Sequence, residues 1–419
     1  MQRDRLHDLP GVDLLTAPSR PPLPAGPWLV VGLARSGLAA GRLLAGRGER
    51  VVGVDAGTPV LDPPPPFPVR LGTDGLAELD AAAAVAKSPG VPPRAPVVAA
   101  ARERGLPVLG EVELGWRLLD CTFVAVTGTN GKTTVSEWLG HVLRGAGRDV
   151  RVAGNVGTAL TSLVGRPPEI VVCECSSFQL HDTIDFAPDV AVLTGLGSDH
   201  LDWHGSVVAY HAAKREAFVR QGPGQVAVVP PGIDVPGAAR RVVFGEEDGA
   251  LPGAHNRRNA GAVAAAARAL GVPEAGIAAG LASFGGVAHR LRELAVVAGV
   301  SWVDDSKATN VESALTALDA YAGERVHVIL GGDDAKGEDF SPLRGRAHAA
   351  YLIGEAAGRL EREVGGLRCG DLERAVAAAA AAAEPGEIVL LSPACASYDQ
   401  YRDFAERGRH FARLVESLG

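Results

Sequence analysis

A loop of seven residues in the middle of the chain, 128–134 (Gly-Thr-Asn-Gly-Lys-Thr-Thr), has the residue types that bind a nucleoside triphosphate. It follows the apolar run Phe123–Val126, which predicts a buried strand, and it precedes a stretch at 135–143 whose apolar residues are spaced along one face of a helix. Backbone N–H groups at the start of that helix favour phosphate, while Lys132 and Thr133 supply a cation and a ligand for Mg²⁺. A glycine-rich turn without a ligand is the weaker alternative. The expected ATP contacts in this loop are Gly128, Thr129, Asn130, Gly131, Lys132, Thr133 and Thr134.

Two further polar groups follow predicted strands in the same part of the chain. Glu174 comes directly after the apolar run 170–173, and His200 follows the run 190–193 after a short loop. In an open parallel sheet, residues beyond the carboxyl ends of the strands line the ligand crevice. Carboxylate oxygen suits Mg²⁺, so we favour a metal role for Glu174 over a role in capping a helix. For His200, a metal ligand or an acid–base group competes with an ordinary loop histidine.

Three residues on predicted helices are ambiguous when they are judged alone. Lys214 lies in a charged helical segment, for which a solvent-exposed lysine is the default interpretation. Asn256 and Asn259 lie at the start of an alanine-rich helix, where capping of the helix and contact with a nucleotide are equally favoured. The residue types alone therefore do not decide their roles.

The last third of the chain offers groups for binding anions. The segment 304–310 combines a strand end, a lysine and hydroxyl groups before a helix, which is typical of an anion site. Arg290 precedes it, and its side chain could reach a triphosphate when domains close. Lys336 is a second candidate cation for a small carboxylate. Ser397 and Phe404, judged alone, are a helix cap and a core residue.

The beginning of the chain predicts a βαβ unit of the dinucleotide-binding type. A strand at 28–31 leads into the turn Gly32–Gly37, a helix follows, and a second strand ends at Asp55. Ala34 replaces the middle glycine of the usual fingerprint. The turn therefore either cradles a diphosphate or is a tight turn without a ligand. A later apolar stretch ends in the loop Ser88–Gly90.

Strands that alternate with helices predict an α/β protein of parallel sheets, and 419 residues leave room for about three domains. We expect an N-terminal domain over 1–111, of which 1–26 is an irregular extension, a central domain over 112–286 and a C-terminal domain over 287–419. An apolar fraction of 47% is enough for substantial cores, and 21% charged residues argue against disorder.

Charge and cysteine content restrict the partners and the location. A net charge of −8 argues against a nucleic-acid partner. The five cysteines are odd in number and irregular in spacing, which indicates neither a disulfide framework nor a zinc site, and Cys173 and Cys175 are expected to be buried in a strand. The sequence predicts neither a signal peptide nor a membrane-spanning segment. We therefore expect a monomer in the cytoplasm without membrane insertion.

Taken together, these motifs resemble those of the Mur ligases of peptidoglycan precursor synthesis, and especially the D-glutamate-adding members of that family. Val126 stands where a general phosphate loop has glycine, as in Mur-type and folylpolyglutamate-type ligases. Ala34, Ala56 and Gly195 depart from the family pattern, and these departures concern the UDP contacts rather than the class of reaction. Besides the phosphate loop, the similar segments are 174–180, 199–202, 253–256, 289–290, 305–310, 330–333 with Lys336, and 391–397.

The resemblance implies a Rossmann-like UDP-binding domain, a central ATPase domain with a parallel sheet, and a Rossmann-like C-terminal domain. It implies that the protein adds D-glutamate to UDP-N-acetylmuramoyl-L-alanine through an acyl phosphate, with ATP converted to ADP and phosphate. Lys132, Glu174, His200 and Lys214 are then catalytic, and a carbamate forms on Lys214. Thr133, Glu174, His200 and Lys214 are the implied Mg²⁺ ligands.

The resemblance also assigns binding residues outside the phosphate loop. For ATP they are Asn256, Asn259, Arg290 and Asp305. For the UDP-linked substrate they are Gly32, Ser36, Asp55, Gly90 and Asn155. For D-glutamate they are Thr309, Lys336, Ser397 and Phe404.

Three other functions compete with this one. A related ligase, either folylpolyglutamate-like or adding a different residue to a UDP-muramoyl substrate, would use the same machinery. A nicotinamide oxidoreductase would use the unit at 28–55 but leave the phosphate loop without a role. A regulatory phosphate-loop protein would hydrolyse ATP without a carboxylate acceptor.

Overall fold

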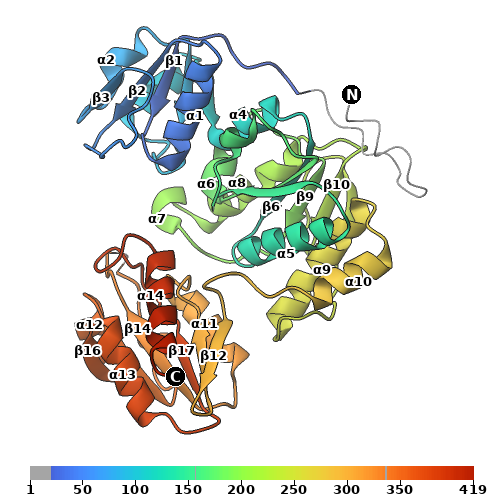
Figure 1. Ribbon diagram of the computed structural model, residues 1–419. Coiled ribbons are helices and arrows are strands. Elements are labelled where there is room, and N and C mark those ends of the chain that lie inside the picture. Colours follow the sequence, from blue (N-terminus) through green and yellow to red (C-terminus); the bar gives the residue numbers. More distant parts are fainter. Residues whose placement is uncertain (1–19, 156, 336) are drawn as a thin grey trace. The chain divides into compact units, whose positions relative to one another are not determined.

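The computed structural model describes residues 20–155, 157–335 and 337–419, and its strands form three separate sheets (Figure 1). By the contacts within it, the chain divides into two compact units, Met1–Phe284 and Gly285–Gly419, and each is described by itself. The first unit holds two sheets and the second unit holds one.

The first sheet, of order β3-β2-β1-β4-β5, has β1 at its centre. Trp28 of β1 is aligned with Val51 on one side and with Ala84 on the other, and both pairings are parallel. The turn after β1 is tight, because a side chain on Gly37 would lie 1.8 Å from the carbonyl oxygen of Gly32. The elements are β1 (Trp28–Val31), α1 (Arg35–Gly46), β2 (Val51–Asp55), β3 (Val69–Leu71), α2 (Leu76–Leu79), β4 (Ala84–Lys87), α3 (Pro96–Glu103), β5 (Val108–Gly110) and α4 (Glu111–Leu118).

The second sheet, of order β11-β10-β9-β6-β8-β7, carries the phosphate loop. Its pairings are parallel, so the carboxyl ends of neighbouring strands meet at one edge. The loop 128–134 leaves that edge from β6 and runs into α5. The elements are β6 (Thr122–Thr127), α5 (Lys132–Gly145), β7 (Val150–Gly154), η2 (Leu160–Leu163), β8 (Ile170–Glu174), α6 (Ser177–His181), β9 (Val190–Leu193), α7 (Leu201–His204), α8 (Val207–Val219), β10 (Val226–Val229), β11 (Arg240–Val243), α9 (Ala254–Ala269) and α10 (Glu274–Ala282).

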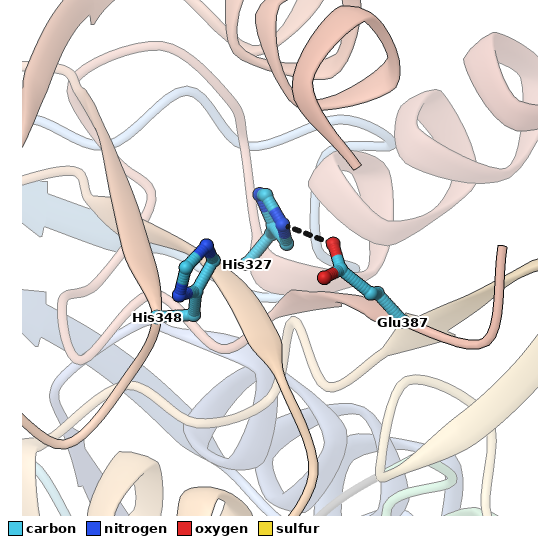
Figure 2. Close-up of side chains that lie close together, drawn as sticks. All are labelled: His327, His348 and Glu387. Atoms are coloured by element: carbon cyan, nitrogen blue, oxygen red, sulfur yellow. Dashed lines mark hydrogen bonds and ion pairs between the residues drawn. The ribbon is translucent and has the colours of Figure 1, made fainter. Parts of the chain in front are cut away.

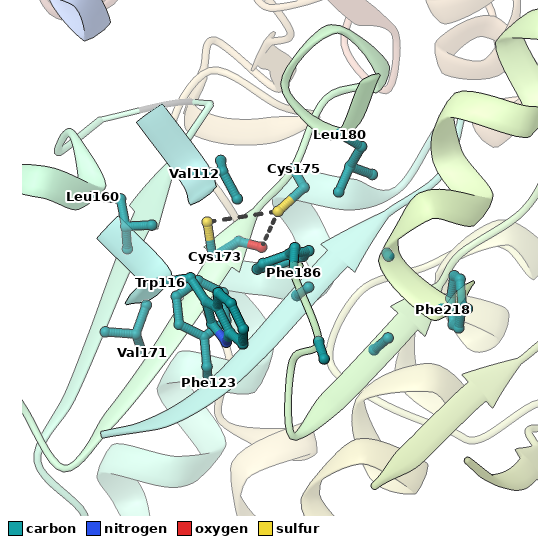
Figure 3. Packing of buried hydrophobic residues seen from close by; sticks show 14 of the residues in the cluster. Val112, Trp116, Phe123, Leu160, Val171, Cys173, Cys175, Leu180, Phe186 and Phe218 are labelled. Carbon is teal, nitrogen blue, oxygen red and sulfur yellow. Dashed lines mark hydrogen bonds between the residues drawn. The ribbon is translucent and has the colours of Figure 1, made fainter. Parts of the chain in front are cut away.

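A buried aromatic cluster packs against this sheet (Figure 3). Phe186 contacts Trp116 and Phe123 edge to face, with ring centroids 5.7 and 5.5 Å apart. Each buried ring stabilises the fold by about 2–3 kcal/mol through burial, and edge-to-face pairing adds to this. Cys173 and Cys175 are buried beside the rings with their sulfurs 3.6 Å apart, and all five cysteines are free thiols. Cys173 lies in β8 as predicted, whereas Cys175 lies just after that strand.

The third sheet, of order β12-β13-β17-β14-β15-β16, forms the second unit. β12 is antiparallel to β13, and the remaining pairings are parallel. Asp304 and Leu391 are aligned at the carboxyl ends of β13 and β17. The elements are β12 (Arg292–Val297), β13 (Val300–Asp304), α11 (Val311–Ala320), β14 (Val326–Gly331), η3 (Ser341–Leu343), β15 (Ala349–Ile353), α12 (Ala357–Glu363), β16 (Leu367–Gly370), α13 (Leu372–Ala382), β17 (Ile388–Leu391) and α14 (Phe404–Glu416).

The predicted α/β class with parallel sheets is confirmed. The strands predicted at apolar runs lie within about two residues of their expected bounds. Six strands were missed, namely β3, β5, β10, β11, β12 and β16. Exposed polar residues interrupt the apolar pattern in the edge strands β11 and β12, whereas β10 is a buried apolar run that the pattern could have identified. Every helix within the described residues is too short or too polar to span a lipid bilayer.

Candidate functional site

The phosphate loop requires glycine at two positions for steric reasons. Gly128 has φ of 149°, and a side chain on it would lie 1.9 Å from the hydroxyl of Thr194. Gly131 has φ of 81°, and a side chain there would lie 2.5 Å from the amide oxygen of Asn259. Both conformations lie in the left-handed region that non-glycine residues rarely adopt. The loop therefore keeps its backbone close to its neighbours, which leaves its N–H groups at the start of α5 for phosphate.

Neighbouring strand ends hold the loop in place. The N–H of Thr129 donates to the carbonyl of Gly195 at 3.0 Å, and its hydroxyl accepts from the N–H of Gly197 at 2.8 Å. Gly195 thus supports the loop through its backbone, although it departs from the family pattern. Lys132 Nζ donates to the carbonyls of Gly128 and Thr129 at 2.9 and 2.8 Å, so its ammonium lies against the loop itself.

Lys214 lies against the same loop, which overturns the default interpretation of a solvent-exposed side chain. It is 1% exposed, and its Nζ donates to the carbonyl of Gly128 at 2.7 Å. The ammonium lies 4.4 Å from the ring centroid of Tyr210. Burial, and then the nearby charge of Lys132, lowers the pKa of Lys214 to about 6. An amine with this pKa is largely neutral at pH 7.

The spacing of the buried residues on α8 explains why Lys214 is buried. Tyr210, Ala213, Ala217 and Phe218 are also buried, and together with Lys214 they follow the i, i+3, i+4, i+7, i+8 pattern of one helix face. The lysine therefore interrupts an apolar face rather than a polar one. This pattern is present in the sequence and could have identified the residue.

The candidate metal ligands surround the phosphate loop at the edge of the second sheet. Glu174 is 3% exposed and aligned with Val126, two residues before the loop. His200, at the start of α7, has its ring 6.4 Å from that of Tyr210, whose hydroxyl donates to Thr129 at 3.2 Å. Thr133 is buried in the first turn of α5. Thr133, Glu174, His200 and Lys214 thus all lie near the carboxyl edge of the second sheet.

The candidate residues for the UDP-linked substrate form a second group, which is connected to the first. Asp55 accepts hydrogen bonds from the N–H groups of Leu33 and Gly57 at 2.7 and 2.8 Å and so fixes the turn after β1. Arg35, in the same turn, donates to the carbonyl of Asn155 at 2.7 Å. Asn155 in turn donates to Glu174 at 3.0 Å.

Arg35 was not selected from the sequence, because a lone arginine in a turn gives no signal of its partners. Through Asn155, it links the turn of the first sheet to the predicted metal site. Ser36 is half-buried and Gly90 is exposed near this turn. Gly32 has φ of 84°, and a side chain on it would lie 2.6 Å from Val91 and 2.8 Å from Ser88.

The candidate ATP contacts Asn256 and Asn259 lie on α9, which packs against α5. Asn256 donates to the carbonyl of Pro252 at 2.8 Å, and Asn259 donates to the side chain of Asn256 at 3.2 Å. The N-cap of this helix is Gly253, without a side-chain capping bond. The capping alternative is therefore wrong for both asparagines, and Asn259 lies beside Gly131 of the phosphate loop.

The second unit carries its own set of candidate residues at the carboxyl edge of its sheet. Asp305 accepts from Ser392 at 2.8 Å and from the N–H of Leu291 at 3.2 Å. Burial raises the pKa of Asp305 to about 7, opposed by the charge of Arg290. Arg290 and Asp305 therefore interact electrostatically within this unit.

The glutamate candidates lie near the same edge. Ser397 is buried, and its carbonyl accepts from the N–H of Tyr401 at 2.8 Å. Phe404 begins α14, where Asp403 is the cap, and its ring lies 5.6 Å from Lys307 Nζ. Ser397 is therefore not a helix cap, and Phe404 is only half-buried. Thr309 is half-buried just before α11, and Lys336 lies outside the described residues.

Arg407 on α14 holds this edge together and was missed by the sequence analysis. It is 1% exposed and donates to the hydroxyl and carbonyl of Ser306 at 3.0 and 2.9 Å. It also donates to the carbonyls of Cys395 and Ala396 at 3.1 and 3.2 Å. Burial lowers its pKa to about 10. One guanidinium thus connects the segment after β13 with the segment after β17.

We expect Arg407→Met to destabilise the second unit by about 3 kcal/mol, because several buried carbonyls lose their donor. Urea unfolding followed by tryptophan fluorescence measures this. Trp302, buried 6.1 Å from Phe411 of α14, is the one tryptophan of the second unit, and its signal is read by difference against a Trp302→Phe variant in each background. Arg409→Met, at an exposed position of α14, is the matched control and should change little. Equal midpoints for the two variants would contradict the role given to Arg407.

Comparisons with known proteins agree with this arrangement. The Mur ligase middle domain matches residues 126–241, and the Mur ligase glutamate ligase domain matches residues 289–395. A UDP-N-acetylmuramoylalanine–D-glutamate ligase from Anaeromyxobacter dehalogenans is 41% identical over 92% of this chain and 96% of that protein.

Solved structures share the fold at lower identity. The MurF ligase of Thermotoga maritima in complex with ADP is 20% identical, covering 88% of this chain and 96% of that chain, with a TM-score of 0.59. A bifunctional folylpolyglutamate synthase/dihydrofolate synthase with Mn, AMPPNP and L-glutamate bound is 19% identical, covering 71% of this chain and 90% of that chain, with a TM-score of 0.53.

Proposed function

Because this chain belongs to the Mur ligase family, and within it to the UDP-N-acetylmuramoylalanine–D-glutamate ligases, we propose that its two sets of polar residues join D-glutamate to UDP-N-acetylmuramoyl-L-alanine at the expense of ATP. The protein is an ATP-dependent ligase of peptidoglycan precursor synthesis. The single observation that carries the proposal is the phosphate loop, with Lys132 and the buried Lys214 both placed against its backbone.

The phosphate loop binds the triphosphate of ATP in this proposal. The N–H groups at the start of α5 and the ammonium of Lys132 neutralise the phosphate oxygens, and this neutralisation matters most as charge develops during transfer. Asn259 lies beside the loop, and with Asn256 it forms the nucleotide contact on α9. Arg290 and Asp305 of the second unit are the remaining proposed ATP contacts.

The residues around the loop fit a divalent metal ion. Thr133 and Glu174 offer oxygen ligands, which Mg²⁺ prefers, and His200 offers a nitrogen. Glu174 is buried at the strand end, where a bound cation would compensate the cost of burying its charge. When bound, the ion would supply positive charge to the phosphate oxygens.

We assign a carbamate to Lys214 because the buried amine is largely neutral at pH 7. Its nitrogen lone pair forms a bond to the carbon of CO₂, one C=O electron pair moves to oxygen, and the nitrogen loses a proton to water. The product carries a negative charge in place of a neutral amine. It would thereby offer a further oxygen ligand for the metal ion, and its negative charge would be attracted to the ammonium of Lys132.

The reaction proceeds in two balanced steps. An oxygen of the alanyl carboxylate attacks the γ-phosphorus, the bond to the β–γ bridging oxygen breaks, and ADP leaves with an acyl phosphate formed. The amine of D-glutamate then attacks the acyl carbon, loses a proton, and expels phosphate. Lys132 stabilises the charge in the first step, and exclusion of water protects the acyl phosphate from hydrolysis.

The two substrates bind at different edges in this proposal. The UDP-linked substrate contacts Gly32, Ser36, Asp55 and Gly90 of the first sheet, and Asn155 connects that region to Glu174. For D-glutamate we propose Thr309, Ser397, Phe404 and Lys336 of the second unit. We also propose a cytoplasmic location, where ATP is available and free thiols such as the five found here stay reduced.

An isotope experiment tests the acyl phosphate. The substrate is made with ¹⁸O at both oxygens of the alanyl carboxylate, and the released phosphate is analysed by mass spectrometry. We expect one ¹⁸O in each phosphate, since one carboxylate oxygen leaves with phosphorus and the other stays in the amide. Phosphate without ¹⁸O would mean that water, not the carboxylate, attacks ATP, and the proposed mechanism would be wrong.

A further inference from the structure

Three potential metal ligands cluster in the second unit, outside the proposed ligase machinery. They are His327, His348 and Glu387, and one donor atom from each lies within 4.8 Å of the others (Figure 2). His327 is the second residue of β14, while His348 and Glu387 directly precede β15 and β17. Because β14 lies between β17 and β15, the parallel register brings the three residues together.

The cluster lies at the opposite end of the sheet from the ligand-binding residues. The proposed glutamate and ATP contacts follow the carboxyl ends of the strands, whereas these three groups lie at the amino ends of β14, β15 and β17. In sheets of this type, ligands bind beyond the carboxyl ends. The cluster is therefore separate from the catalytic residues of the same unit.

Buried contacts hold two of the ligands in fixed orientations. The side chains of His327 and Glu387 are 2% and 6% exposed, and His327 Nε2 lies 2.8 Å from the carboxylate. Its other ring nitrogen, Nδ1, lies 2.9 Å from the hydroxyl of Tyr351. Without a cation, Nε2–H donates to the carboxylate; in the other tautomer Nδ1–H donates a hydrogen bond to the Tyr351 oxygen, which leaves the Nε2 lone pair for a cation. Metal-binding histidines usually have such a partner on the second nitrogen.

The carboxylate stays ionised at this position. The N–H of Glu384 donates to Glu387 at 2.9 Å, and this bond is the largest cause that lowers the pKa of Glu387 to about 2, with His327 and Arg325 as further causes. Glu387 thus offers a carboxylate whose orientation the backbone of Glu384 holds.

A cation already occupies the space between these groups. The guanidinium of Arg325 forms an ion pair with Glu387 and donates to His348 Nε2 at 2.8 Å. Its side chain is 58% exposed, so it can turn into solvent without loss of a core contact. The lone pair of His348 and the charge of Glu387 are therefore directed at a position that accommodates positive charge.

We propose that His327, His348 and Glu387 bind a divalent transition-metal ion of the zinc class, which takes the place of the Arg325 guanidinium. Two imidazoles and one carboxylate are a known ligand set for zinc, with water in the fourth position. Ligand atoms around tetrahedral zinc lie roughly 3.3 Å apart, given bond lengths of about 2.0–2.1 Å. The three donor atoms lie within 4.8 Å of one another, and the exposed side chain of His348 can move to bring them to this spacing. The ion would connect the amino ends of β14, β15 and β17.

Binding of Zn²⁺ to the full-length protein tests the proposal, measured by competition with a chromophoric chelator in the presence of MgATP, with Co²⁺ absorption as a second readout. The wild type should bind one equivalent more than His348→Ala. Glu387→Gln should weaken this equivalent by roughly 10–100-fold or more, and Arg325→Gln should tighten it, because the competing cation is gone. His410→Ala, a half-buried histidine of the same unit, is the control and should leave Zn²⁺ binding unchanged.

The gain of affinity in Arg325→Gln separates a metal site from a simple ion-pair network, and it does not depend on the ligase reaction. In the presence of a metal chelator, the midpoint of thermal unfolding of each variant should lie within a few degrees of that of the wild type. Glu387→Gln is the exception, because the buried contacts of its carboxylate are weakened. Equal Zn²⁺ stoichiometry in the wild type and His348→Ala would overturn the proposal. Failure of Arg325→Gln to bind more tightly than the wild type would overturn it as well.

Discussion

Replacing Lys132 with alanine is expected to lower kcat of the ligase reaction by roughly 10²–10³-fold, which is the typical effect of losing one charged group at a developing negative charge. In this structure the Lys132 ammonium donates hydrogen bonds to the carbonyls of Gly128 and Thr129 of the phosphate loop. Steady-state phosphate release with all three substrates measures the effect. The KM for ATP should rise by a smaller factor than kcat falls, because the negative charge that Lys132 stabilises is greatest on the phosphoryl group in the transition state.

Arg144→Ala provides the matched control, because it removes an exposed cation from the other end of the same helix. Its kcat should stay within about twofold of the wild type. Circular dichroism and the thermal midpoint show whether Lys132→Ala still folds, since its two loop hydrogen bonds are lost as well. A folded Lys132→Ala variant with wild-type kcat would exclude the proposed role of the phosphate loop.

Replacing Lys214 with methionine should abolish ligase activity while leaving the protein at least as stable. We expect an activity loss of at least roughly 10²-fold, because the proposed carbamate and its proposed contact with the metal ion are lost. Stability should hold or rise, because a buried amine on an apolar helix face is replaced by an apolar chain of similar volume. Parallel assays of phosphate release and of thermal unfolding in CO₂-free buffer measure the two effects. A purely structural lysine would lose stability along with activity.

The pH dependence of stability gives this prediction a second, independent readout. The pKa of Lys214 is lowered from 10.5 to about 6 by folding, so between these pH values the unfolded state binds more protons than the folded state. Its contribution to stability is therefore fully present above pH 10.5 and lost as pH falls through 6. Without CO₂, the unfolding free energy of the wild type should rise with pH more steeply than that of Lys214→Met, by at most about 1.4 kcal/mol per pH unit.

Two controls complete the Lys214 experiment. Arg220→Ala, at the half-buried C-cap of α8 where the arginine pairs with Glu216, should change neither activity nor the pH slope. Added bicarbonate should raise wild-type activity in CO₂-depleted buffer and have no effect on Lys214→Met. Wild-type activity that is independent of bicarbonate after complete CO₂ removal would contradict the carbamate but not the phosphate loop.

The phosphate loop could be predicted because its signal is local. Strand, glycines, lysine and helix are consecutive in the sequence, and each residue type has a steric or electrostatic reason visible within about 20 residues. The ATP contacts proposed for this loop accordingly needed no tertiary information. The α/β class follows for the same reason, since buried parallel strands appear as uninterrupted apolar runs.

Residues whose roles depend on distant partners could not be predicted. Arg407 donates a hydrogen bond to Ser306, which lies 101 positions away in the sequence. Lys87 of β4 forms a buried ion pair with Asp182 at 2.7 Å, and these two residues are similarly remote in the sequence. Arg407 and Lys87 both appear in the sequence as ordinary surface cations. Burial also lowers the pKa of Lys87, which Asp182 opposes. Only the packing of strand ends against other segments reveals such groups.

Lys214 lies between these two cases. Its chemical neighbours, Gly128 and Lys132, are more than 80 positions away, yet the apolar residues spaced around it on α8 show which face it occupies. A lysine in the middle of an apolar helix face is expected to be buried, even when its neighbours in the sequence are charged. Membership of the Mur ligase family excludes the oxidoreductase and switch-protein alternatives.

Phosphate release with ATP, Mg²⁺ and UDP-N-acetylmuramoyl-L-alanine is the most direct test of the central claim, with D-glutamate, L-glutamate and other amino acids supplied in turn. We expect release that requires both the UDP-linked substrate and D-glutamate, with one amide formed per phosphate. Release with a different amino acid would keep the ligase mechanism but contradict the assignment of Thr309, Lys336, Ser397 and Phe404. Release that needs no acceptor would contradict the account as a whole.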